Sequence, residues 1–320
     1  MSARIVYHAP GGGHGHVVRG LAVLRRLGGG TVIGPARLAG WGAALRVRYV
    51  SPAGDDGAVW VAAQSPPDLL LADVFPRGVV GELMPWLGRA PAWLVARRVS
   101  PAYYLRADVR AVIESCFERV LWAEEPPEAL RVLAVTQVRV PPVLLAPPVL
   151  PRAEARRRLG VDDDRALLLG LGSGEPAQQA RMARLLARIA VRCGATLRFV
   201  SAELPAAPGV VRLFPAAAWL EAADAVVTAA GYHAFHETAA AGVPTVFVPQ
   251  RRRVDDQWWR ARDALVAPDP PALEAAVWRL LREGRRERRR LEDGAAAVAA
   301  LVQRRVQAGV LAQEQVAAMT

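Results

Sequence analysis

The 320-residue sequence contains no lysine and no asparagine, so all 41 of its basic side chains are arginine. A P-loop of the kind that holds nucleotide phosphates needs a Lys-Ser or Lys-Thr pair, so ATP hydrolysis of that kind is excluded. The formal charge of +11 would ordinarily suggest a nucleic acid or an anionic membrane as partner. Because the sequence is also rich in Ala, Gly, Pro and Val, we attribute part of this charge to GC-rich coding and predict no nucleic-acid partner.

Cysteine is scarce as well, and the two that are present, Cys116 and Cys193, lie far apart without metal-ligand spacing. This pattern argues against a disulfide framework and a zinc site, and it fits a reducing compartment. Long apolar runs are also missing, because no stretch reaches the roughly 18 to 20 residues that a membrane span needs. A glycine loop follows residues 5–7 almost directly, which leaves no room for a signal peptide. We therefore expect a cytoplasmic protein, with peripheral contact at the inner face of the membrane left open.

What the sequence does contain is a repeated alternation of apolar runs and helical segments. Residues 4–8 form an apolar run that ends in a glycine loop, and residues 16–27 follow with Val17, Leu21 and Leu24 at helical spacing. Such βα units build parallel sheets that helices cover. Further strands are predicted at 31–33, 46–50, 69–72, 92–96 and 120–122, with helices at 79–87 and 109–116. The first half of the chain is therefore predicted to be a doubly wound α/β domain.

Residues 139–151 contain five prolines, which cannot continue a helix or a central strand and indicate a stiff, extended linker. We place the domain boundary there, with an N-terminal domain of residues 1–145 and a C-terminal domain of residues 146–320 whose last helix could pack back on the first. After the linker the alternation restarts, with a loop at 172–176 and a helix that Pro176 can begin. Strands are predicted at 166–171, 197–200, 210–213, 225–227 and 245–248. The fold expected is two Rossmann-like domains facing across a cleft, and the arginine-rich run at 284–290 is interpreted as a solvated helix face.

All five histidines fall in two short segments, each at or just after an expected strand: His8, His14, His16, His233 and His236. In open α/β sheets, ligands bind beyond the carboxyl ends of the strands, where such loops lie. We therefore predict that these two segments form the site, one in each domain.

The first segment is a glycine loop followed by a helix. Its spacing does not satisfy G-x-G-x-x-G, and no acidic residue follows at the distance that would hold a ribose, so NAD binding is disfavoured. The backbone at Gly13 and Gly15 can approach a ligand closely, and Arg19 lies one turn after His16 on roughly the same helix face. These groups are therefore candidates for contacting a phosphate or an acceptor substrate. A neutral imidazole at His16 can accept a proton from a hydroxyl nucleophile. The alternative is that His14 and His16 only satisfy backbone groups.

The second segment carries Gly231, Tyr232 and His233 into a helix. A helix N-terminus offers N–H groups and a positive dipole end to a phosphate. Glu237 in this helix, and Gln257 after the next strand, are placed to bond sugar hydroxyls. The alternative for Glu237 is an ordinary charge on the helix surface.

Residues 11–24 and 214–261 resemble the two signature regions of the MurG-like glycosyltransferases of GT-B fold, whose best-known member adds N-acetylglucosamine to a peptidoglycan lipid precursor. The resemblance covers the whole chain in layout, but only these regions and the glycine loop at 172–173 in motif. It implies that His16 is the catalytic base, and that Asp256 and Gln257, ahead of Trp258, take the place of the family's paired glutamines. Donor contacts are predicted from Gly172, Ser173, Gly231, Tyr232, His233, Glu237, Asp256 and Gln257.

The sequence departs from that family at two places. The family's threonine in the first loop is absent, and the surrounding residues are closer to other GT-B relatives than to the peptidoglycan enzyme. The family's arginine just past the linker, which holds the diphosphate, is matched by Leu150, so Arg152 or Arg19 would have to substitute. The peptidoglycan acceptor is therefore not implied.

These features predict an inverting transfer of a sugar from a nucleoside diphosphate sugar, with UDP as the expected nucleotide, to a hydroxyl acceptor. His16 would deprotonate the acceptor, and Asp73 at the end of strand 69–72 would orient His16 or bind the acceptor. N–H groups at Ser173 and Gly231, together with an arginine, would neutralise the departing diphosphate. Neither a metal ion nor another cofactor is expected, and a lipid-linked acceptor stays open.

Three other classes of protein remain compatible with these residues. A UDP-sugar 2-epimerase of the same two-domain fold would convert the donor without an acceptor. A metal-binding protein could use His14, His16, His233 and His236, although no carboxylate or cysteine completes a familiar ligand spacing. A noncatalytic sensor would bind a nucleotide sugar without turnover.

Overall fold

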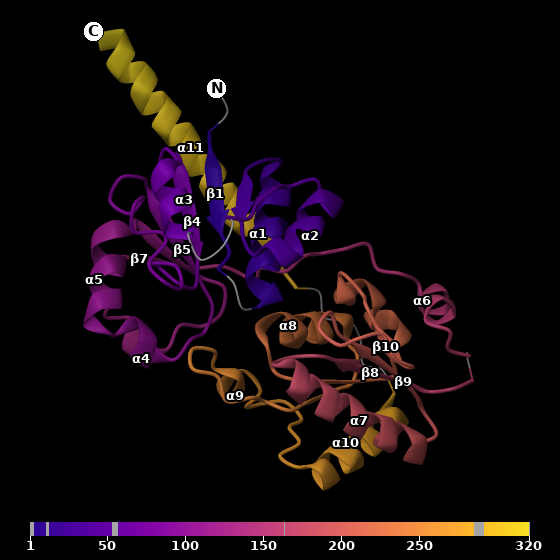
Figure 1. Cartoon of the computed structure of the whole chain (residues 1–320). Coiled ribbons are helices and arrows are strands. Elements are labelled where there is room, and N and C mark those ends of the chain that lie inside the picture. The colour runs from indigo at the N-terminus through magenta and orange to yellow at the C-terminus, as the bar shows by residue number, and fades with distance from the viewer. Residues whose placement is uncertain (1–2, 11–12, 53–56, 163, 285–290, 320) are drawn as a thin grey trace. The chain divides into compact units, whose positions relative to one another are not determined.

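The computed structural model describes residues 3–10, 13–52, 57–162, 164–284 and 291–319. The chain divides into two compact units, the first formed by residues 1–145 with 292–320 and the second by residues 146–291 (Figure 1). Each unit has its own parallel sheet, and each is described by itself below. Both cysteines, Cys116 and Cys193, are free thiols. No helix among the described residues is long and apolar enough to cross a membrane.

The sheet of unit 1 has seven strands in the order β3-β2-β1-β4-β5-β6-β7, and all neighbours are parallel. Its strands are β1 (Ile5–His8), β2 (Thr31–Ile33), β3 (Arg48–Val50), β4 (Leu69–Asp73), β5 (Ala92–Ala96), β6 (Arg119–Trp122) and β7 (Thr136–Arg139). Every residue of β4 and β5 is buried. Unbroken apolar runs of this kind are typical of central parallel strands, which helices cover on both faces.

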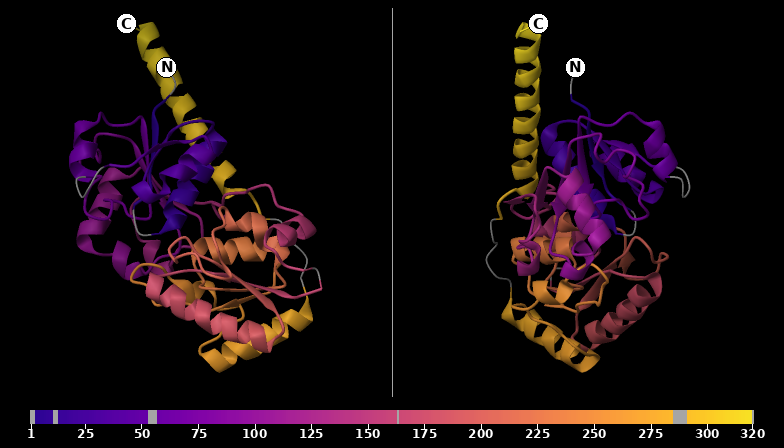
Figure 2. Two further views of the ribbon diagram at one scale, coloured as in Figure 1. Left: turned by 45° about the vertical axis from the view of Figure 1, so that its right-hand side comes forward. Right: turned by 90° about the vertical axis from the view of Figure 1, so that its left-hand side faces the viewer.

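The helices of unit 1 are α1 (His14–Leu27), α2 (Ala39–Ala44), α3 (Gly57–Ala63), α4 (Pro101–Tyr104), α5 (Ala107–Cys116) and α11 (Gly294–Met319). Helix α1 lies close against β1, because a Cβ at Gly20 would be 2.6 Å from Cδ1 of Tyr7. Helix α11 contacts α1, and its last turns extend beyond the rest of the unit (Figure 2). The chain thus returns to unit 1 after it has completed unit 2.

Unit 2 contains a five-stranded parallel sheet in the order β10-β9-β8-β11-β12. Its strands are β8 (Leu167–Leu171), β9 (Thr196–Val200), β10 (Val210–Val211), β11 (Ala225–Thr228) and β12 (Thr245–Phe247). Its helices are α6 (Arg152–Arg158), α7 (Pro176–Arg192), α8 (Tyr232–Ala241), α9 (Gln257–Arg260) and α10 (Pro270–Glu283). Helix α7 begins at Pro176, with Glu175 and Gln178 forming a reciprocal capping box.

In each sheet the order in which the chain adds strands switches sides once, and this switch point determines where the ligand-facing loops lie. In unit 1 the chain builds outward from β1 to β3 and then restarts at β4 on the other side of β1. In unit 2 it builds from β8 to β10 and restarts at β11 beside β8. Loops that leave two such neighbouring strands diverge and open a crevice at the carboxyl edge of the sheet. The crevices therefore lie between the loops after β1 and β4, and between the loops after β8 and β11. The predicted class, doubly wound parallel α/β, is confirmed.

The predicted helix at 79–87 is wrong, because this segment is a series of turns. Gly78 and Gly81, with φ of 81° and 93°, break the helical path. The Glu82 carboxylate accepts hydrogen bonds from the N–H groups of Val79 and Val80, which stabilises the turns. Sequence reasoning also missed β7, whose residues lack an apolar run. The arginine-rich run begins after α10 has ended, and its residues 285–290 lie outside the described residues, as do Gly11 and Gly12 of the first loop.

Candidate functional site

The crevice of unit 1 brings three of the predicted residues into contact. His16 lies in the first turns of α1, Arg19 follows one turn later, and Asp73 is the last residue of β4. Nδ1 of His16 is 3.5 Å from Oδ2 of Asp73. The Arg19 guanidinium reaches the same carboxylate with two nitrogens, Nη2 at 2.9 Å from Oδ1 and Nε at 3.1 Å from Oδ2. The fold therefore pairs a histidine with a carboxylate that lies 57 positions later in the chain.

Burial makes this pairing electrostatically important. Asp73 is fully buried and Arg19 is 2% exposed, so each charge depends on the other for compensation. Although burial alone would raise it, the charge of Arg19 and the contacts of Arg19 and His16 with the carboxylate hold the pKa of Asp73 below its usual value. Burial lowers the pKa of His16 despite the opposing carboxylate. The imidazole is thus neutral near pH 7, the form that a general base requires.

The hydrogen-bonding partners of His16 also bear on its tautomer. A carboxylate accepts hydrogen bonds, so Asp73 favours the proton on Nδ1 and leaves the lone pair on Nε2. The Nη2 atom of Arg19 is 3.3 Å from Nδ1 and can only donate, which favours the opposite tautomer. Nη2 carries two N–H groups, one for Oδ1 of Asp73 and one that can reach Nδ1, so the geometry allows both tautomers. A general base at Nε2 requires the one whose Nδ1 proton is directed to Oδ2. On the other side of the ring, a Cβ at Gly13 would lie within 4.0 Å of Nε2, so a glycine there keeps this edge uncovered.

The other predicted residues of the first loop have separate environments. Gly15 lies in the first turn of α1. The His14 ring packs against Trp41 at a centroid distance of 5.1 Å. Nε2 of His8 lies 3.4 Å from Oε1 of Glu82. His8 and His16 thus each have a carboxylate partner at this edge of the sheet, and the partner of His16, Asp73, is the one that Arg19 also holds.

Arg19 was predicted to contact a phosphate or the acceptor, and its place in the structure favours another role. Its guanidinium is buried against Asp73 and His16, which leaves little surface for a ligand. Arg152, the other predicted substitute for the diphosphate arginine, bonds to Asp224 and to the carbonyl of Glu221. Asp224 directly precedes β11, so Arg152 lies at the amino edge of the sheet, away from the crevice. The prediction for Arg152 is therefore wrong.

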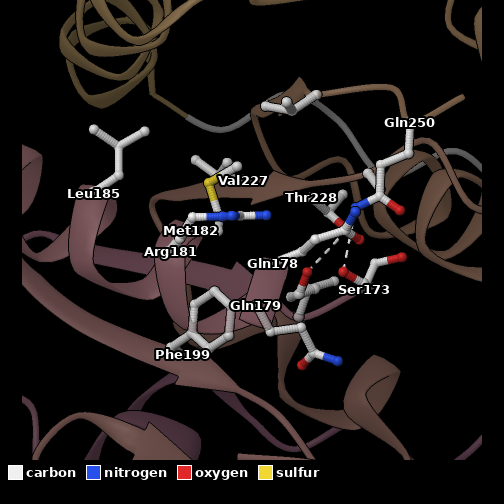
Figure 3. Close-up of a pocket in the computed structure, with 13 residues that line it drawn as sticks. Ser173, Gln178, Gln179, Arg181, Met182, Leu185, Phe199, Val227, Thr228 and Gln250 are labelled. Atoms are coloured by element: carbon white, nitrogen blue, oxygen red, sulfur yellow. Dashed lines mark hydrogen bonds between the residues drawn. The ribbon is translucent and has the colours of Figure 1, made fainter. Parts of the chain in front are cut away.

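The crevice of unit 2 begins at the glycine loop after β8. A Cβ at Gly172 would come within 2.8 Å of the Val200 carbonyl oxygen, so only glycine fits there. The carbonyl of Ser173 accepts a hydrogen bond from Nε2 of Gln250, 3.2 Å away, which connects this loop to the segment after β12 (Figure 3). Arg252 donates to the same Gln250 side chain, and its Nη2 would lie 3.0 Å from a Cβ at Gly174. Arg252 thus brings a positive charge to this loop, which the sequence prediction had missed.

A cavity of about 270 Å³ lies behind this loop, at the carboxyl ends of β8, β11 and β12. Met182, Leu185 and Phe199 line its apolar part, and Gln178 and Gln250 lie near Ser173 at the other end (Figure 3). Among the predicted donor contacts only Ser173 lines it. The cavity therefore extends from the predicted site beneath α7 and does not enclose that site.

The second loop of this crevice leads into α8. Gly231 is the N-cap of the helix and makes no side-chain cap hydrogen bond, and the N-terminus of a helix presents N–H groups and a positive dipole end that favour an anion. Tyr232 is buried and packs edge-on against the rings of His233 and His236. Nη1 of Arg260 donates to the Ala230 carbonyl at 2.7 Å, which fixes the loop just before the helix. This arrangement is suited to an anion.

Glu237 lies one turn further along α8 and is partly buried. Burial raises the pKa of its carboxyl from 4.5 to about 8. A carboxyl with this pKa is mostly protonated near pH 7, and a protonated carboxyl can both donate and accept hydrogen bonds, as sugar hydroxyls do. Strongly raised carboxyl pKa values are common where a protein binds or transforms a ligand.

Asp256 and Gln257 support the loop after β12. Asp256 is the N-cap of α9, and its Oδ1 accepts from the Trp259 N–H. Gln257 is 3% exposed, accepts from the Gln250 N–H and donates to Asp255. Both residues thus hold in place the segment that carries Gln250, and the predicted direct contact of Gln257 with a sugar is not the role that its burial favours.

Replacing Glu237 with glutamine should remove a pH-dependent part of the stability. A carboxyl whose pKa is raised on folding contributes stability that is fully present below about pH 4.5 and is lost as the pH rises through about 8. Glutamine stays neutral, so the variant should melt above the wild type at about pH 9 and nearly with it at about pH 5. Thermal melts of both proteins across this range test the expectation, and an equal difference at both pH values would contradict it.

The described residues contain no group of three or more His, Cys, Asp or Glu side chains placed to hold a metal ion. His14 and His16 belong to unit 1, whereas His233 and His236 belong to unit 2. The metal-binding alternative therefore receives no support from the part of the chain that the structure describes.

Comparisons with known proteins identify the fold. No protein-family model matches the chain, and no curated protein matches it. The glycotransferase of kitacinnamycin superposes with a TM-score of 0.64 at 17% identity, over 95% of this chain and 99% of that chain. Spinosyn forosaminyltransferase SpnP gives a TM-score of 0.61 at 16% identity, over 96% of this chain and 95% of that chain. Spinosyn rhamnosyltransferase SpnG complexed with thymidine diphosphate gives a TM-score of 0.54 at 16% identity, over 95% of this chain and 96% of that chain. SpnG has also been solved with spinosyn aglycone. The chain therefore has the GT-B fold, as the sequence predicted.

Proposed function

We propose that this chain is a metal-independent glycosyltransferase that moves a sugar from a nucleoside diphosphate sugar to a hydroxyl acceptor. The observation that carries the proposal is the buried contact of His16 with Asp73 and Arg19 at the carboxyl edge of the unit 1 sheet, together with two glycine loops suited to an anion at the crevice of unit 2. The fold adds support, because the solved structures that share it are named as sugar transferases. Unit 1 would then serve the acceptor and unit 2 the donor.

The proposed reaction is a single displacement at the anomeric carbon. Nε2 of His16 takes the proton of the acceptor hydroxyl as its oxygen forms the new bond to that carbon. The bond between the anomeric carbon and the diphosphate breaks, and the diphosphate leaves with the electron pair. One displacement of this kind inverts the configuration at the anomeric carbon. Asp73 acts through His16, because it fixes the proton on Nδ1 and stabilises the imidazolium that forms.

The departing diphosphate needs positive groups. The N–H groups in the first turn of α8 and in the loop at Ser173 supply them from the backbone, and Arg252 supplies a full charge beside the same loop. We assign to Arg252 the role first predicted for Arg152 or Arg19. Glu237 would bond the donor through sugar hydroxyls.

The nucleotide proposed is UDP, on the resemblance of the two signature segments to MurG-like enzymes. Thymidine diphosphate is the second candidate, because SpnG has been solved with it. For the acceptor we propose an apolar molecule with a hydroxyl group. Phe75 packs beside His16, and Val79, Val80 and Met84 nearby in the sequence are exposed. A lipid-linked acceptor, with contact at the inner face of the membrane, remains one form of this proposal.

Calorimetric titration with UDP-, TDP- and GDP-sugars tests the donor half of the proposal. The wild type should bind one of them, and Glu237→Ala should weaken that binding by about tenfold, as expected for the loss of one or two hydrogen bonds. His14→Ala, in unit 1, is the matched control and should leave donor affinity unchanged. Equal affinities of wild type and Glu237→Ala would remove Glu237 from the donor site.

Two alternative functions are compatible with the same fold, and a turnover assay distinguishes them from sugar transfer. A UDP-sugar 2-epimerase would alter the donor without an acceptor, whereas a noncatalytic sensor would bind the donor and release no product. His16 favours transfer over the sensor, because a histidine that contacts a carboxylate at the ligand-facing edge of the sheet is typical of a general base.

A further inference from the structure

The backbone between Asp73 and Phe75 adopts an uncommon conformation. Val74 has φ of 64°, the left-handed region that a β-branched residue rarely enters. The Phe75 N–H donates to the Asp73 carbonyl at 2.7 Å, which closes a three-residue γ-turn of the strained kind. Among the described residues only Arg46 shares a positive φ without being glycine. Val74 is fully buried, so no solvent contact explains this choice of residue.

Neighbouring groups hold both sides of the strained residue. The Val74 N–H donates to the Val95 carbonyl at 3.0 Å, as a continuation of the β4–β5 pairing. The Val74 carbonyl accepts from the Tyr104 hydroxyl at 2.7 Å. Tyr104 is fully buried at the end of α4. A strained backbone conformation persists only where the surrounding structure holds it in place. Here Val95 of β5 and Tyr104 of α4 hold Val74 through hydrogen bonds to its N–H and its carbonyl.

The turn changes what the end of β4 presents to α1. In an extended strand, Asp73 and Phe75 would point to the same side about 7 Å apart, whereas the γ-turn brings them closer together. The Asp73 carboxylate then reaches Nδ1 of His16, while the Phe75 ring lies 5.6 Å from the imidazole, centroid to centroid. Phe75 in turn packs edge-on against Tyr103 at 5.7 Å. One strained residue thus places two different groups against the same histidine.

We propose that Val74 is a positioning residue, and that its strained turn holds Asp73 and Phe75 against His16 in the orientation that proton transfer requires. The inference rests on the proposed function for its activity readout alone. The strain and the environment of the imidazole can be measured whether or not the protein transfers sugars.

Val74→Ala and Val74→Gly separate the strain from the loss of side-chain packing. At an ordinary buried strand position alanine is more stable than glycine, and Val120→Ala and Val120→Gly in β6 should show this order. At Val74 the order should invert, with the glycine variant melting at least ~2 °C above the alanine variant, because glycine adopts positive φ without strain. The activity should be kept in Val74→Gly, because glycine adopts the turn without strain. It should fall at least ~10-fold in Tyr104→Phe, which lacks the hydroxyl that holds the Val74 carbonyl, since small misplacements of reacting groups are costly.

Nitrogen-15 NMR of the histidine rings supplies a readout that a merely structural role would not move. The His16 nitrogens should keep their wild-type shifts in Val74→Gly and change in Tyr104→Phe, which removes only the hydrogen bond that holds the turn. A normal stability order at Val74 would overturn the strain. Wild-type His16 signals and wild-type activity in Tyr104→Phe would overturn the positioning role. If the wild type shows no transfer with any donor, the proposed function fails, and the melting and NMR results still decide this inference.

Discussion

Replacing His16 with alanine should lower the rate of sugar transfer by about 10²- to 10⁴-fold, the contribution typical of a general base. The donor should still bind, because its proposed contacts lie in unit 2. His14→Ala is the matched control, since this ring lies two residues away and packs against Trp41. Steady-state rates with saturating donor would measure both variants.

The pH dependence gives the His16 assignment a second test. Burial lowers the pKa of His16, so the base should remain active below the ordinary histidine value of about 6.5. Tyr7, Arg19, Asp73 and Arg97 are the titratable or charged groups that influence this site. A His16→Ala variant that retains the wild-type rate and pH profile would remove His16 from the mechanism.

Replacing Arg19 with methionine should destabilise unit 1 by about 3–5 kcal/mol, because it leaves the fully buried Asp73 carboxylate without its counter-charge. Burial of an unpaired charge is far more costly than the loss of a surface ion pair. The double variant Arg19→Met with Asp73→Leu removes both charges and should recover most of the lost stability. Denaturant unfolding of the wild type, both single variants and the double variant would complete the cycle.

An exposed pair of the same type provides the control for this cycle. Arg305 and Glu118 form an ion pair at 2.9 Å with both side chains more than a third exposed, and Arg305→Met should cost less than about 1 kcal/mol. If Arg19→Met were equally mild, Asp73 would not depend on Arg19, and the electrostatic account of the His16 site would be wrong.

Much of the fold could be predicted because central parallel strands have a direct signal in the sequence. Residues 69–72 of β4 and all of β5 are apolar. Gly172 marks a loop where a side chain would clash, and Gly231 marks the start of a helix. The position of His16 followed from the same logic, since ligands bind where loops leave the carboxyl ends of such strands.

The contacts of the site were harder to predict, because they depend on pairing across the sheet. Arg19 was expected to face a ligand, and nothing local to α1 indicates that Asp73 would bury it. Gln257 was expected to contact a sugar, but its amide is used by Gln250 and Asp255. Val74 gives no signal at all, because valine is ordinary in a strand and its positive φ exists only in the folded chain. The sequence thus indicates which segments reach the carboxyl edges of the sheets, whereas the partners of each side chain depend on the folded chain.

The central claim is tested most directly by release of the nucleoside diphosphate from UDP-, TDP- and GDP-sugars, with and without apolar hydroxyl acceptors. The proposed function predicts that one donor is consumed only when an acceptor is present and that a glycoside of inverted anomeric configuration forms in equal amount. His16→Ala should slow both by about 10²- to 10⁴-fold. Isomerisation of the donor without an acceptor, or binding of a donor without turnover across the acceptor panel, would contradict it.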